Sequence, residues 1–298
     1  MIWIFWSESQ ARKSPEIYIE TMKIYKVTSG ILIESAGKFY LEHLNWDEFI
    51  NDDNLFAKAT NLIDTKTPIE NGEELIKNEL LPPIQSQEIW ASGVTYFNSK
   101  LARQEESKDA GGGDFYARVY VADRPELFFK STAHRAVGSG GKVRIRKDST
   151  WDVPEPELTL FITSNGKIVG YTIGNDMSSR SIEGENPLYL PQAKTYDGSA
   201  SIGPCLYVSE SPLPKETEIE LLIRRNGETV FSGKTEIGQI KRDLNELVTW
   251  LFRETSFPNG CFLMTGTGIV PTTDFTLKNA DEILITIKPI GTLVNFVE

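Results

Sequence analysis

An Asn-Gly pair, Asn165-Gly166, stands between two stretches that alternate like β-strands, at residues 158–163 and 167–174. Such a pair between two strands is the strongest short-range signal for a β-hairpin, because both central residues of a type I′ turn need a positive φ angle. We therefore predict a hairpin with a two-residue loop, in which Ser164 pairs with Lys167. This pairing fixes the register of both strands and so decides which side chains share a face.

The predicted register makes one face of the hairpin apolar and the other face acidic. The apolar pairs are Leu158 with Ile173, Leu160 with Tyr171 and Ile162 with Val169, and Thr159 pairs with Thr172 on the other face. On that second face Glu155 lies opposite Asp176, and Glu157 points the same way as Glu155 because it follows two residues later. Directly paired β-carbons are about 4.5–5.5 Å apart, so three carboxylates are expected to converge on one small volume.

Three carboxylates this close together repel one another, and protons or a cation must offset the repulsion. Ligands that are all oxygen atoms suit a hard divalent ion. Glu155, Glu157 and Asp176, here called the acidic triad, are therefore a candidate site for Mg²⁺, with Mn²⁺ or Ca²⁺ as substitutes. The alternative is a slipped register that leaves three separate acids on the surface, and the regular apolar pairing argues against it.

The composition limits the classes of function. The chain has 31 Lys and Arg against 42 Asp and Glu, a net charge of −11, and a negative field of this kind repels the phosphates of nucleic acid. The two histidines, His43 and His134, are far apart in the sequence, which argues against His-based zinc sites and Ser-His-Asp triads. Two cysteines, and apolar runs well short of ~20 residues, favour a cytoplasmic protein that binds neither nucleic acid nor membrane.

The chain divides near residue 85, because Leu81-Pro82-Pro83 favours an extended linker. We expect residues 1–85 to form a small α/β domain and residues 86–298 to form a second domain that carries the acidic face. Strands dominate the second region, so the pattern predicts a β-rich α+β fold. Predicted helices span residues 46–59, 72–80 and 244–254, and another helix begins near residue 98. Asp243 and Glu246 form a predicted capping box at the start of the helix at 244–254. Predicted strands lie within 22–42 and at 88–93, 143–146, 216–225, 229–232 and 282–288.

Four segments carry a resemblance to a known family: PEPEL at 154–158, GYTIGNDMSSR at 170–180, QAKTYDGSASIGP at 192–204 and MTGTG at 264–268. In this order they resemble the fumarylacetoacetate hydrolase family, over roughly residues 88–294. The resemblance implies the rolled β-sheet catalytic domain of that family, with a small N-terminal domain in front of it. It also implies assembly as a homodimer or homotetramer.

The resemblance implies roles for individual residues as well. It assigns Mg²⁺ to the acidic triad and brings Lys194 to the substrate. It further implies that Ser92, Lys130 and Thr267 bind the substrate, Lys130 from the segment DRPELFFK and Thr267 through the substrate carboxylate. Glu126, in the same DRPELFFK segment, is placed near the pocket.

Within the family, the sequence resembles the dehydratases of 2-keto-3-deoxy sugar acids, in the segments GVTYFNSKLARQEES, RPELFFK, WDVPEPEL and SSRSIEGENPLYLPQAK. With such a substrate, Mg²⁺ would act as a Lewis acid on the carboxylate and the 2-oxo group. We expect Lys194 to remove the proton from carbon 3, because a nearby cation lowers the affinity of a lysine for its proton. Glu126 is its expected partner in proton transfer while hydroxide leaves carbon 4.

Two other functions remain open on the sequence. The first is a metal-dependent hydrolase or decarboxylase of 2,4-dioxo acids with the same fold. Hydrolysing members of the family have a histidine after the segment that reads GVTY here, at residues 93–96, and this chain has none there, which disfavours hydrolysis. The second is a protein in which the metal only stabilises the structure, and Lys194 beside the metal argues against it.

Three consecutive glycines make residues 107–114 the most flexible stretch of the sequence. Lys100 and Arg103 precede this stretch on a predicted helix and carry the charge that would attract an anionic substrate. We expect the stretch to be either a lid that closes over the site or a loose surface loop.

Overall fold

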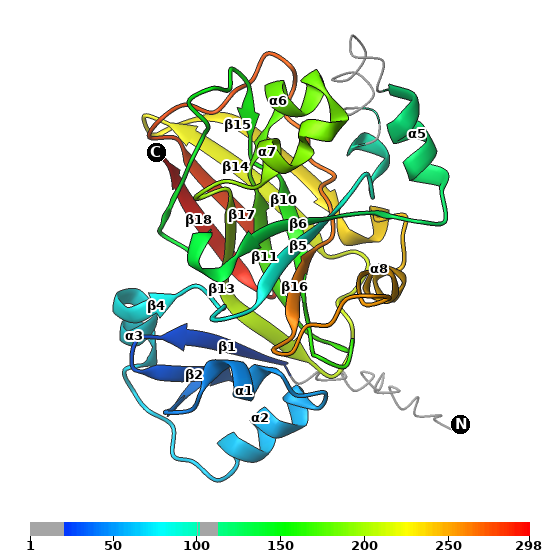
Figure 1. Ribbon diagram of the computed structural model, residues 1–298. Coiled ribbons are helices and arrows are strands. Elements are labelled where there is room, and N and C mark those ends of the chain that lie inside the picture. Colours follow the sequence, from blue (N-terminus) through cyan, green and yellow to red (C-terminus); the bar gives the residue numbers. More distant parts are fainter. Residues whose placement is uncertain (1–20, 100, 102–112) are drawn as a thin grey trace, which may run out of the picture.

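The computed structural model describes residues 21–99, 101 and 113–298, and two β-sheets make up most of this part of the chain (Figure 1). The larger sheet has 11 strands, in the order β3 (Lys38–Glu42), β2 (Gly30–Ser35), β1 (Thr21–Val27), β13 (Ala200–Ser209), β11 (Ile168–Asp176), β10 (Pro156–Ile162), β16 (Cys261–Met264), β5 (Glu88–Gly93) and β6 (Glu126–Thr132), with β4 (Leu80–Leu81) beside β1 and β7 (Ala136–Val137) beside β13. The second sheet has the order β15 (Glu228–Glu236), β14 (Glu218–Arg225), β17 (Glu282–Ile287), β18 (Gly291–Val297) and β8 (Lys142–Val143). A short pair is formed by β9 (Asp152–Val153) and β12 (Ser178–Ser179).

The helices are short and lie around the sheets. They are α1 (Trp46–Ile50), α2 (Leu55–Ile63), α3 (Gly72–Glu79), α5 (Gly113–Val121), α6 (Arg180–Glu185), α7 (Leu190–Lys194) and α8 (Leu244–Leu251). Among the described residues, no helix is long and apolar enough to cross a membrane. Residues 102–112, which include most of the stretch with three glycines, lie outside the described residues.

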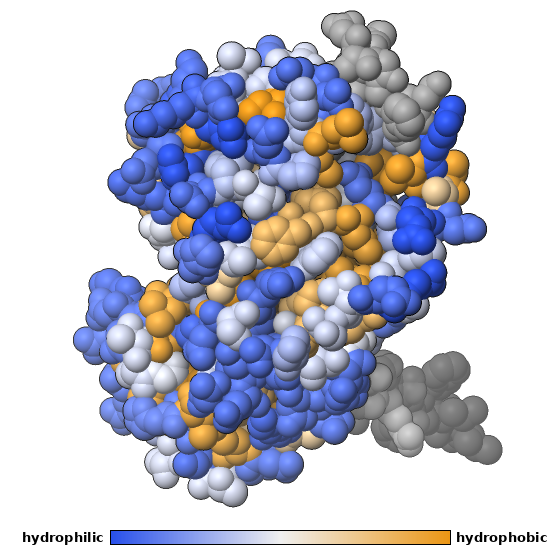
Figure 2. All heavy atoms as spheres, in the orientation of Figure 1, coloured by the Kyte–Doolittle hydropathy of each residue, from blue (hydrophilic) through white to orange (hydrophobic). Residues whose placement is uncertain are grey.

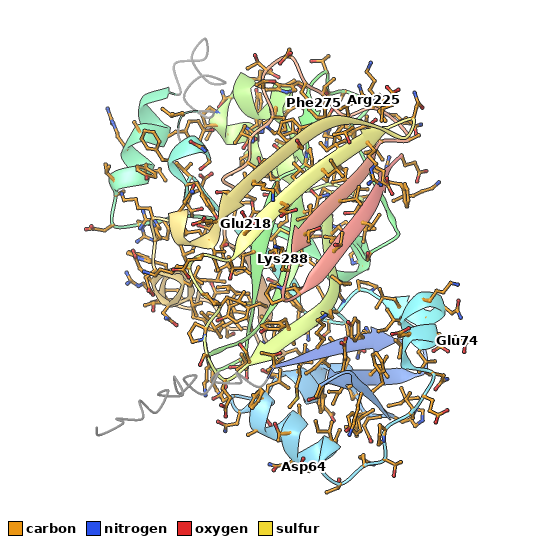
Figure 3. All side chains as sticks on the ribbon, turned by 180° about the vertical axis from the view of Figure 1, so that it is seen from behind. Asp64, Glu74, Glu218, Arg225, Phe275 and Lys288 are labelled. Carbon is orange, nitrogen blue, oxygen red and sulfur yellow. The ribbon has the colours of Figure 1, made fainter. Side chains whose placement is uncertain are left out.

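The main hydrophobic core lies between the two sheets, which pack face to face. Leu158 and Leu160 of β10 meet Leu221 of β14 and Ile285 of β17 there, and each is at most 1% exposed. Figure 3 shows the second sheet from behind, with Glu218 and Arg225 marking the two ends of β14. Removal of these side chains from water is the main favourable term in folding. This core therefore fixes the inner face of the hairpin formed by β10 and β11.

A second core lies on the opposite face of the large sheet. Phe161 of β10 stacks against Phe262 of β16, with ring centroids 5.1 Å apart, and Trp46 and Phe49 of α1 belong to the same cluster. The face of β10 that carries acidic residues at one end therefore carries a packed aromatic ring at the other. The face drawn in Figure 2 is mostly polar, with apolar side chains grouped near its middle.

The predicted register of the hairpin is confirmed from residue 156 to residue 161. Leu158 pairs with Ile173, Thr159 with Thr172 and Leu160 with Tyr171. The prediction is wrong next to the turn, where a bulge shifts the register and Ile162 pairs with Ile168 in place of Val169.

The loop itself differs from the predicted two-residue turn. The backbone N–H of Thr163 donates to the carbonyl of Lys167, so three residues separate the paired positions and Ser164 does not pair with Lys167. Gly166 has a φ of +78°, and Asn165 is not among the residues with positive φ. This is the type I turn followed by a left-handed glycine that three-residue hairpin loops favour. The two-residue loop occurs instead at the second hairpin, where Asn226 and Gly227 have φ angles of +53° and +84°.

The N-terminal strands belong to the same sheet as the acidic hairpin. Strand β1 pairs with β13, and β13 pairs with β11, so the large sheet runs on from the second region into the first. The division near residue 85 therefore stays a prediction about folding units, with backbone pairing across it. The predicted strands at 88–93, 216–225, 229–232 and 282–288 correspond to β5, β14, β15 and β17, and the strand predicted at 143–146 is limited to β8.

Two predicted helices differ from the structure. The helix predicted over 46–59 is divided into α1 and α2. The segment Asn51–Asn54 between them is rich in Asn and Asp side chains, which compete with the helix for hydrogen bonds to the backbone. Asp52, for example, accepts a hydrogen bond from the backbone N–H of Asn54. Helix α8 begins after Asp243, which caps it as predicted, but Glu246 pairs with Arg242 and α8 ends at Leu251.

Candidate active site

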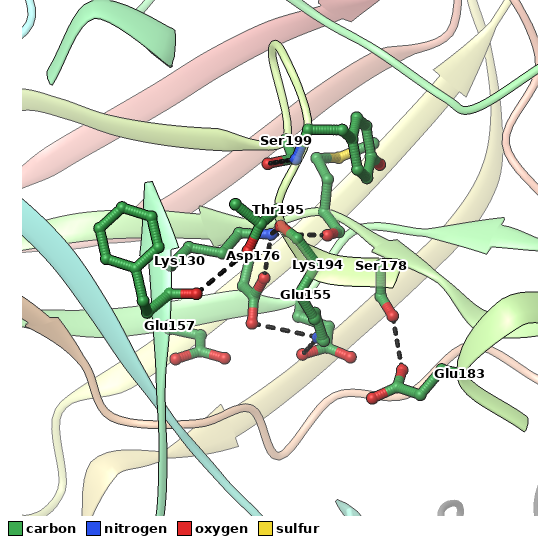
Figure 4. A network of polar contacts seen from close by, with 12 residues as sticks. Lys130, Glu155, Glu157, Asp176, Ser178, Glu183, Lys194, Thr195 and Ser199 are labelled. Atoms are coloured by element: carbon green, nitrogen blue, oxygen red, sulfur yellow. Dashed lines mark hydrogen bonds and ion pairs between the residues drawn. The ribbon is translucent and has the colours of Figure 1, made fainter. Parts of the chain in front are cut away.

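The acidic triad forms where the open ends of β10 and β11 meet. The backbone N–H of Asp176 donates to the carbonyl of Glu155 at 3.0 Å, which continues the predicted pairing past the end of β10. One carboxylate oxygen from each of Glu155, Glu157 and Asp176 lies within 4.8 Å of the others, and all three residues are at most 4% exposed. Figure 4 shows the three side chains turned toward a common region. The convergence predicted from the register is confirmed.

Glu157 is held by the glycine-rich segment after β16. The backbone N–H of Gly266 donates to Glu157 Oε2 at 2.6 Å. Gly266 has a φ of +95°, and a Cβ at this position would lie 2.0 Å from Thr95 Oγ1, so the backbone needs glycine to approach this closely. Burial raises the pKa of Glu157 well above its usual range, and repulsion from Asp176 and Glu155 adds to this effect.

Lys194 contacts two members of the triad. Its Nζ lies 2.7 Å from Glu155 Oε2 and 3.1 Å from Asp176 Oδ2 (Figure 4). The residue ends helix α7 and is fully buried. A buried ammonium needs such partners, because an isolated charge in the interior is costly.

Lys130 of β6 lies behind Asp176. Its Nζ contacts Asp176 Oδ1 at 2.5 Å and donates to the backbone carbonyls of Met177 and Lys194 at 2.9 and 2.5 Å. Two of its three N–H donors are used by these carbonyls, and Asp176 is its ion-pair partner. Burial lowers the pKa of Lys130 to about 8, Lys194 acts in the same direction, and Asp176 opposes the shift. The geometry favours a positioning role for Lys130 over the predicted contact with substrate.

A small cavity adjoins the triad, and its volume of about 10 Å³ is enough for one ion or one water molecule. Of the described residues, those that line it are Ser92, Gly93, Val94, Ser99, Phe128, Glu155, Glu157, Asp176, Arg180, Gly266 and Thr267. The predicted substrate residues Ser92 and Thr267 are therefore brought together with the triad. A sugar acid is larger than this space, so its binding requires neighbouring side chains to move. A groove of about 510 Å³ lies alongside, next to Gly268 and Ile269.

Glu126 lies at the edge of this cavity. It begins β6 and pairs with Gly93 of β5, and Ser92 Oγ donates to its backbone carbonyl at 3.0 Å. A Cβ at Gly93 would lie 2.1 Å from Glu126 Oε2, so the carboxylate rests directly on the glycine backbone. Glu126 thus lies beside two residues that line the cavity, near the pocket, where the family resemblance places it.

Comparison with known proteins identifies the family. Over residues 89–298, the sequence matches the family model described as fumarylacetoacetate (FAA) hydrolase C-terminal. The chain belongs to the fumarylacetoacetate hydrolase family. The predicted family and the predicted β-rich fold are thereby confirmed.

Two named relatives of this chain are dehydratases. A probable 2-keto-3-deoxyxylonate dehydratase of Haloferax volcanii is 50% identical over 216 residues, 72% of this chain and 73% of that protein. The 2-dehydro-3-deoxy-D-arabinonate dehydratase of Saccharolobus solfataricus is 44% identical over 217 residues, 71% and 72% of the two chains. The solved structure of 2-keto-3-deoxy-D-arabinonate dehydratase with magnesium and 2,5-dioxopentanoate has a TM-score of 0.78 at 33% identity, covering 94% of this chain and 99% of that one. These relatives confirm the prediction of an enzyme of the dehydratase branch.

The residues of this fumarylacetoacetate hydrolase family member fit a hard divalent ion. The donors are carboxylate oxygens, the type that Mg²⁺, Mn²⁺ and Ca²⁺ prefer. The raised pKa of Glu157 records repulsion among buried carboxylates, which a cation at this point would relieve. The closeness of the three carboxylates and their oxygen donors both support a divalent ion at the triad.

Sequence reasoning missed the cationic contact on the other side of Glu155. Arg180, at the start of α6, is 2% exposed, lines the cavity and donates from Nη2 to Glu155 Oε1 at 2.7 Å. Glu183, one helical turn later, is 1% exposed. The signals in the sequence were the charges of the segment SSRSIE, two residues after the triad aspartate, and the place of this segment in the stretches that carry the family resemblance. Charges in a short surface-like segment are usually solvated, so this signal was weak.

Proposed function

We propose that the protein is a Mg²⁺-dependent hydro-lyase that converts 2-keto-3-deoxy-D-arabinonate to 2,5-dioxopentanoate and water. The observation that carries the proposal is the buried triad with Lys194 on two of its carboxylates. The named dehydratase relatives support this substrate class. The reaction removes a proton from carbon 3 and hydroxide from carbon 4, and the unsaturated acid that remains tautomerises to the aldehyde.

Glu155, Glu157 and Asp176 would hold the ion, with Mn²⁺ or Ca²⁺ as possible substitutes. Bound there, Mg²⁺ supplies Lewis-acid polarisation of the 2-oxo group, which increases the acidity of the hydrogens on carbon 3. Gly266 orients Glu157 through its backbone N–H, so the carboxylate needs little reorganisation to act as a ligand.

We assign removal of the carbon 3 proton to Lys194. Its Nζ contacts Glu155 and Asp176, so a substrate held at the triad lies beside it. Glu126 lies next to Gly93, which lines the cavity. We propose that Glu126 is the partner that transfers a proton to the hydroxyl group on carbon 4, which then leaves as water.

The remaining residues prepare the site. Lys130 pairs with Asp176 and donates hydrogen bonds to the backbone carbonyls of Met177 and Lys194. Ser92 and Thr267 line the cavity and offer hydroxyl groups for the polar groups of the substrate. Thr267 Oγ1 is 3.2 Å from the backbone of Ile269, which holds its orientation.

The alternative of a hydrolase or decarboxylase of 2,4-dioxo acids has less support. Neither histidine of the chain lines the cavity: His43 contacts the carbonyl of Ser29, and His134 contacts Thr132. Activation of water would then depend on Glu126. A purely structural metal is also less well supported, because Lys194 pairs with the triad and the hydroxyl-bearing residues Ser92 and Thr267 line the cavity beside it.

We also propose that the protein is cytoplasmic, as its cysteine usage favours, and that it is a homodimer or homotetramer, as the resemblance to the family implies. Light scattering on the purified protein tests the assembly. A monomeric mass across a range of concentrations would overturn this part of the proposal.

The function is tested by incubation of the metal-free protein with 2-keto-3-deoxy-D-arabinonate, with and without Mg²⁺, and identification of the product by mass. We expect loss of one water per substrate only with the ion, and an aldehyde that reacts with a carbonyl reagent. A 2-keto-3-deoxyhexonate and a 2,4-dioxo acid serve as competing substrates. Cleavage of a carbon–carbon bond in the 2,4-dioxo acid, with no dehydration, would favour the alternative.

A further inference from the structure

A buried ion pair adjoins the triad and is used by none of the steps above. Glu183 of α6 is 1% exposed, and its Oε2 accepts a hydrogen bond from Ser178 Oγ at 2.7 Å (Figure 4). The same oxygen lies 3.9 Å from Nε of Arg180. Glu183 is not a member of the triad, and buried carboxylates of this kind are rare unless they are paired.

Arg180 connects this carboxylate to the metal ligand Glu155. Its side chain is 2% exposed; Nη2 donates to Glu155 Oε1 at 2.7 Å, and Nε lies 3.9 Å from Glu183 Oε2, an ion pair without a hydrogen bond. Arginine keeps its charge at every relevant pH, and its planar fork holds carboxylates in a defined orientation. One oxygen of Glu155 is thus fixed by Arg180 while the other faces Lys194.

The arrangement has an electrostatic consequence. Lys194 and Arg180 both pair with Glu155, and each reduces the negative charge that Glu155 presents to a metal ion. Glu183 shares the charge of Arg180, so less of that charge acts on Glu155. Interactions between charges are strong at this depth because solvent does not screen them.

The backbone of the segment is built to keep Glu183 in place. Ser178 and Ser179 pair with Val153 and Asp152, and the backbone N–H of Arg180 donates to the carbonyl of Trp151 at 2.8 Å. The chain therefore turns into α6 directly beside the triad. Ser178, fully buried, orients the Glu183 carboxylate from within the same turn.

We propose that Glu183 is a positioning residue for the metal site: it acts through Arg180 to set the orientation and the charge of Glu155. The proposal rests on the proposed metal-dependent function. Loss of the Glu183 charge removes a negative charge beside Arg180, so more of the positive charge of Arg180 acts on Glu155 and on an ion held at the triad. Residues that orient metal ligands from behind typically contribute 10- to 100-fold to metal affinity.

The test is the affinity for Mn²⁺, measured by electron paramagnetic resonance on the metal-free full-length chain without substrate. Glu183→Gln keeps the shape and removes the charge, and Glu185→Gln on the exposed side of the same helix is the matched control. We expect Glu183→Gln to weaken Mn²⁺ binding by about 10- to 100-fold. Glu185→Gln should bind Mn²⁺ as tightly as wild type, and Glu183→Asp should recover part of the affinity that Glu183→Gln loses. Ser178→Ala, which leaves the charge but removes the hydrogen bond, should give a smaller loss and serves if Glu183→Gln does not fold.

The outcomes separate the two proposals. If the wild-type protein binds no Mn²⁺, the proposed metal-dependent function fails, and the role of Glu183 fails with it. If the wild-type protein binds one ion per chain and Glu183→Gln binds it equally well, the role of Glu183 alone is overturned. If Glu183→Gln does not fold and Ser178→Ala binds like wild type, the role of Glu183 is likewise rejected and the pair is only structural.

Discussion

Nζ of Lys194 lies 2.7 Å from Oε2 of Glu155, so a fully buried ammonium contacts a carboxylate of the candidate metal centre. The two residues come from different parts of the fold, Lys194 from the end of α7 and Glu155 from the start of the acidic hairpin. The contact places a proton-transfer group next to the point where a 2-keto acid would be held. It is the basis of the first prediction.

Lys194→Arg should stop the exchange of the carbon 3 hydrogens of the substrate with deuterated water. Arginine keeps the positive charge but does not give up its proton, so charge-based binding survives while base catalysis is lost. We expect exchange, followed by NMR, to slow by at least ~100-fold. Lys167→Arg, at an exposed lysine of the hairpin loop, is the control. Exchange at the wild-type rate in Lys194→Arg would make Glu126 the leading candidate for the base.

Glu157→Gln should abolish metal binding and leave the fold intact. The pKa of Glu157 is raised because the ionised carboxylate is unfavourable when buried beside Asp176 and Glu155. A raised pKa in a folded carboxylate means that ionisation costs folding free energy near neutral pH, and glutamine removes this cost. The metal-free variant should therefore be at least as stable as wild type.

Thermal unfolding with and without Mg²⁺ measures this prediction. At an ion concentration 100 times the dissociation constant, wild type should gain about 2.7 kcal/mol and the variant nothing. Glu228→Gln, at an exposed carboxylate of the second hairpin, should respond like wild type. An equal gain in melting temperature for Glu157→Gln would show that the ion binds elsewhere.

Gly93→Ala should displace the carboxylate of Glu126 without unfolding the protein. The added Cβ would lie 2.1 Å from Glu126 Oε2, and the end of a flexible side chain can move away at small cost. We expect a loss of stability below about 1 kcal/mol, and a fall in kcat/KM of at least about tenfold. In a double-mutant cycle, Gly93→Ala should add nothing further in a Glu126→Gln background. Additive losses would mean that the alanine acts through another residue.

Because of Asp152, the free energy of unfolding should fall as the pH rises from about 4 to about 6. Burial raises its pKa from 3.8 to about 6, so the unfolded chain loses this proton first as pH rises and the folded state becomes less favoured. The cost is complete above pH about 6. Denaturant unfolding of metal-free wild type and Asp152→Asn should therefore show curves that diverge across this window by about 1–2 kcal/mol, with solvent screening included. Parallel curves would exclude the effect.

The sequence predicted the acidic hairpin well because one face of it had to be apolar. A slip of one residue would have moved Leu158 and Leu160 out of the core, so the register near the triad was strongly specified. The loop was less determined: an Asn-Gly pair fits both two-residue and three-residue turns, and the bulge at Ile162 selects the longer one. The error stays at the turn and does not reach Glu155 or Asp176.

The cations around the triad were harder to predict. Lys130 looks like any strand lysine in the sequence, and its burial depends on the carbonyls of Met177 and Lys194, which only the folded chain brings to it. Arg180 and Glu183 depend on the turn of β12 against β9. Contacts between distant segments of this kind leave no periodic pattern in the sequence. The division of helix 46–59 followed from local chemistry that the apolar pattern concealed.

The central claim is that one divalent ion at the acidic triad is required for dehydration, and one titration tests it most directly. Mn²⁺ is added to the metal-free protein, and bound ion and turnover of 2-keto-3-deoxy-D-arabinonate are measured on the same samples. The account predicts that turnover rises in proportion to bound ion and stops rising at one ion per chain, and that Asp176→Asn shows neither. Turnover in the metal-free protein would contradict the account. So would an Asp176→Asn variant that becomes saturated with Mn²⁺ at the same Mn²⁺ concentration as wild type.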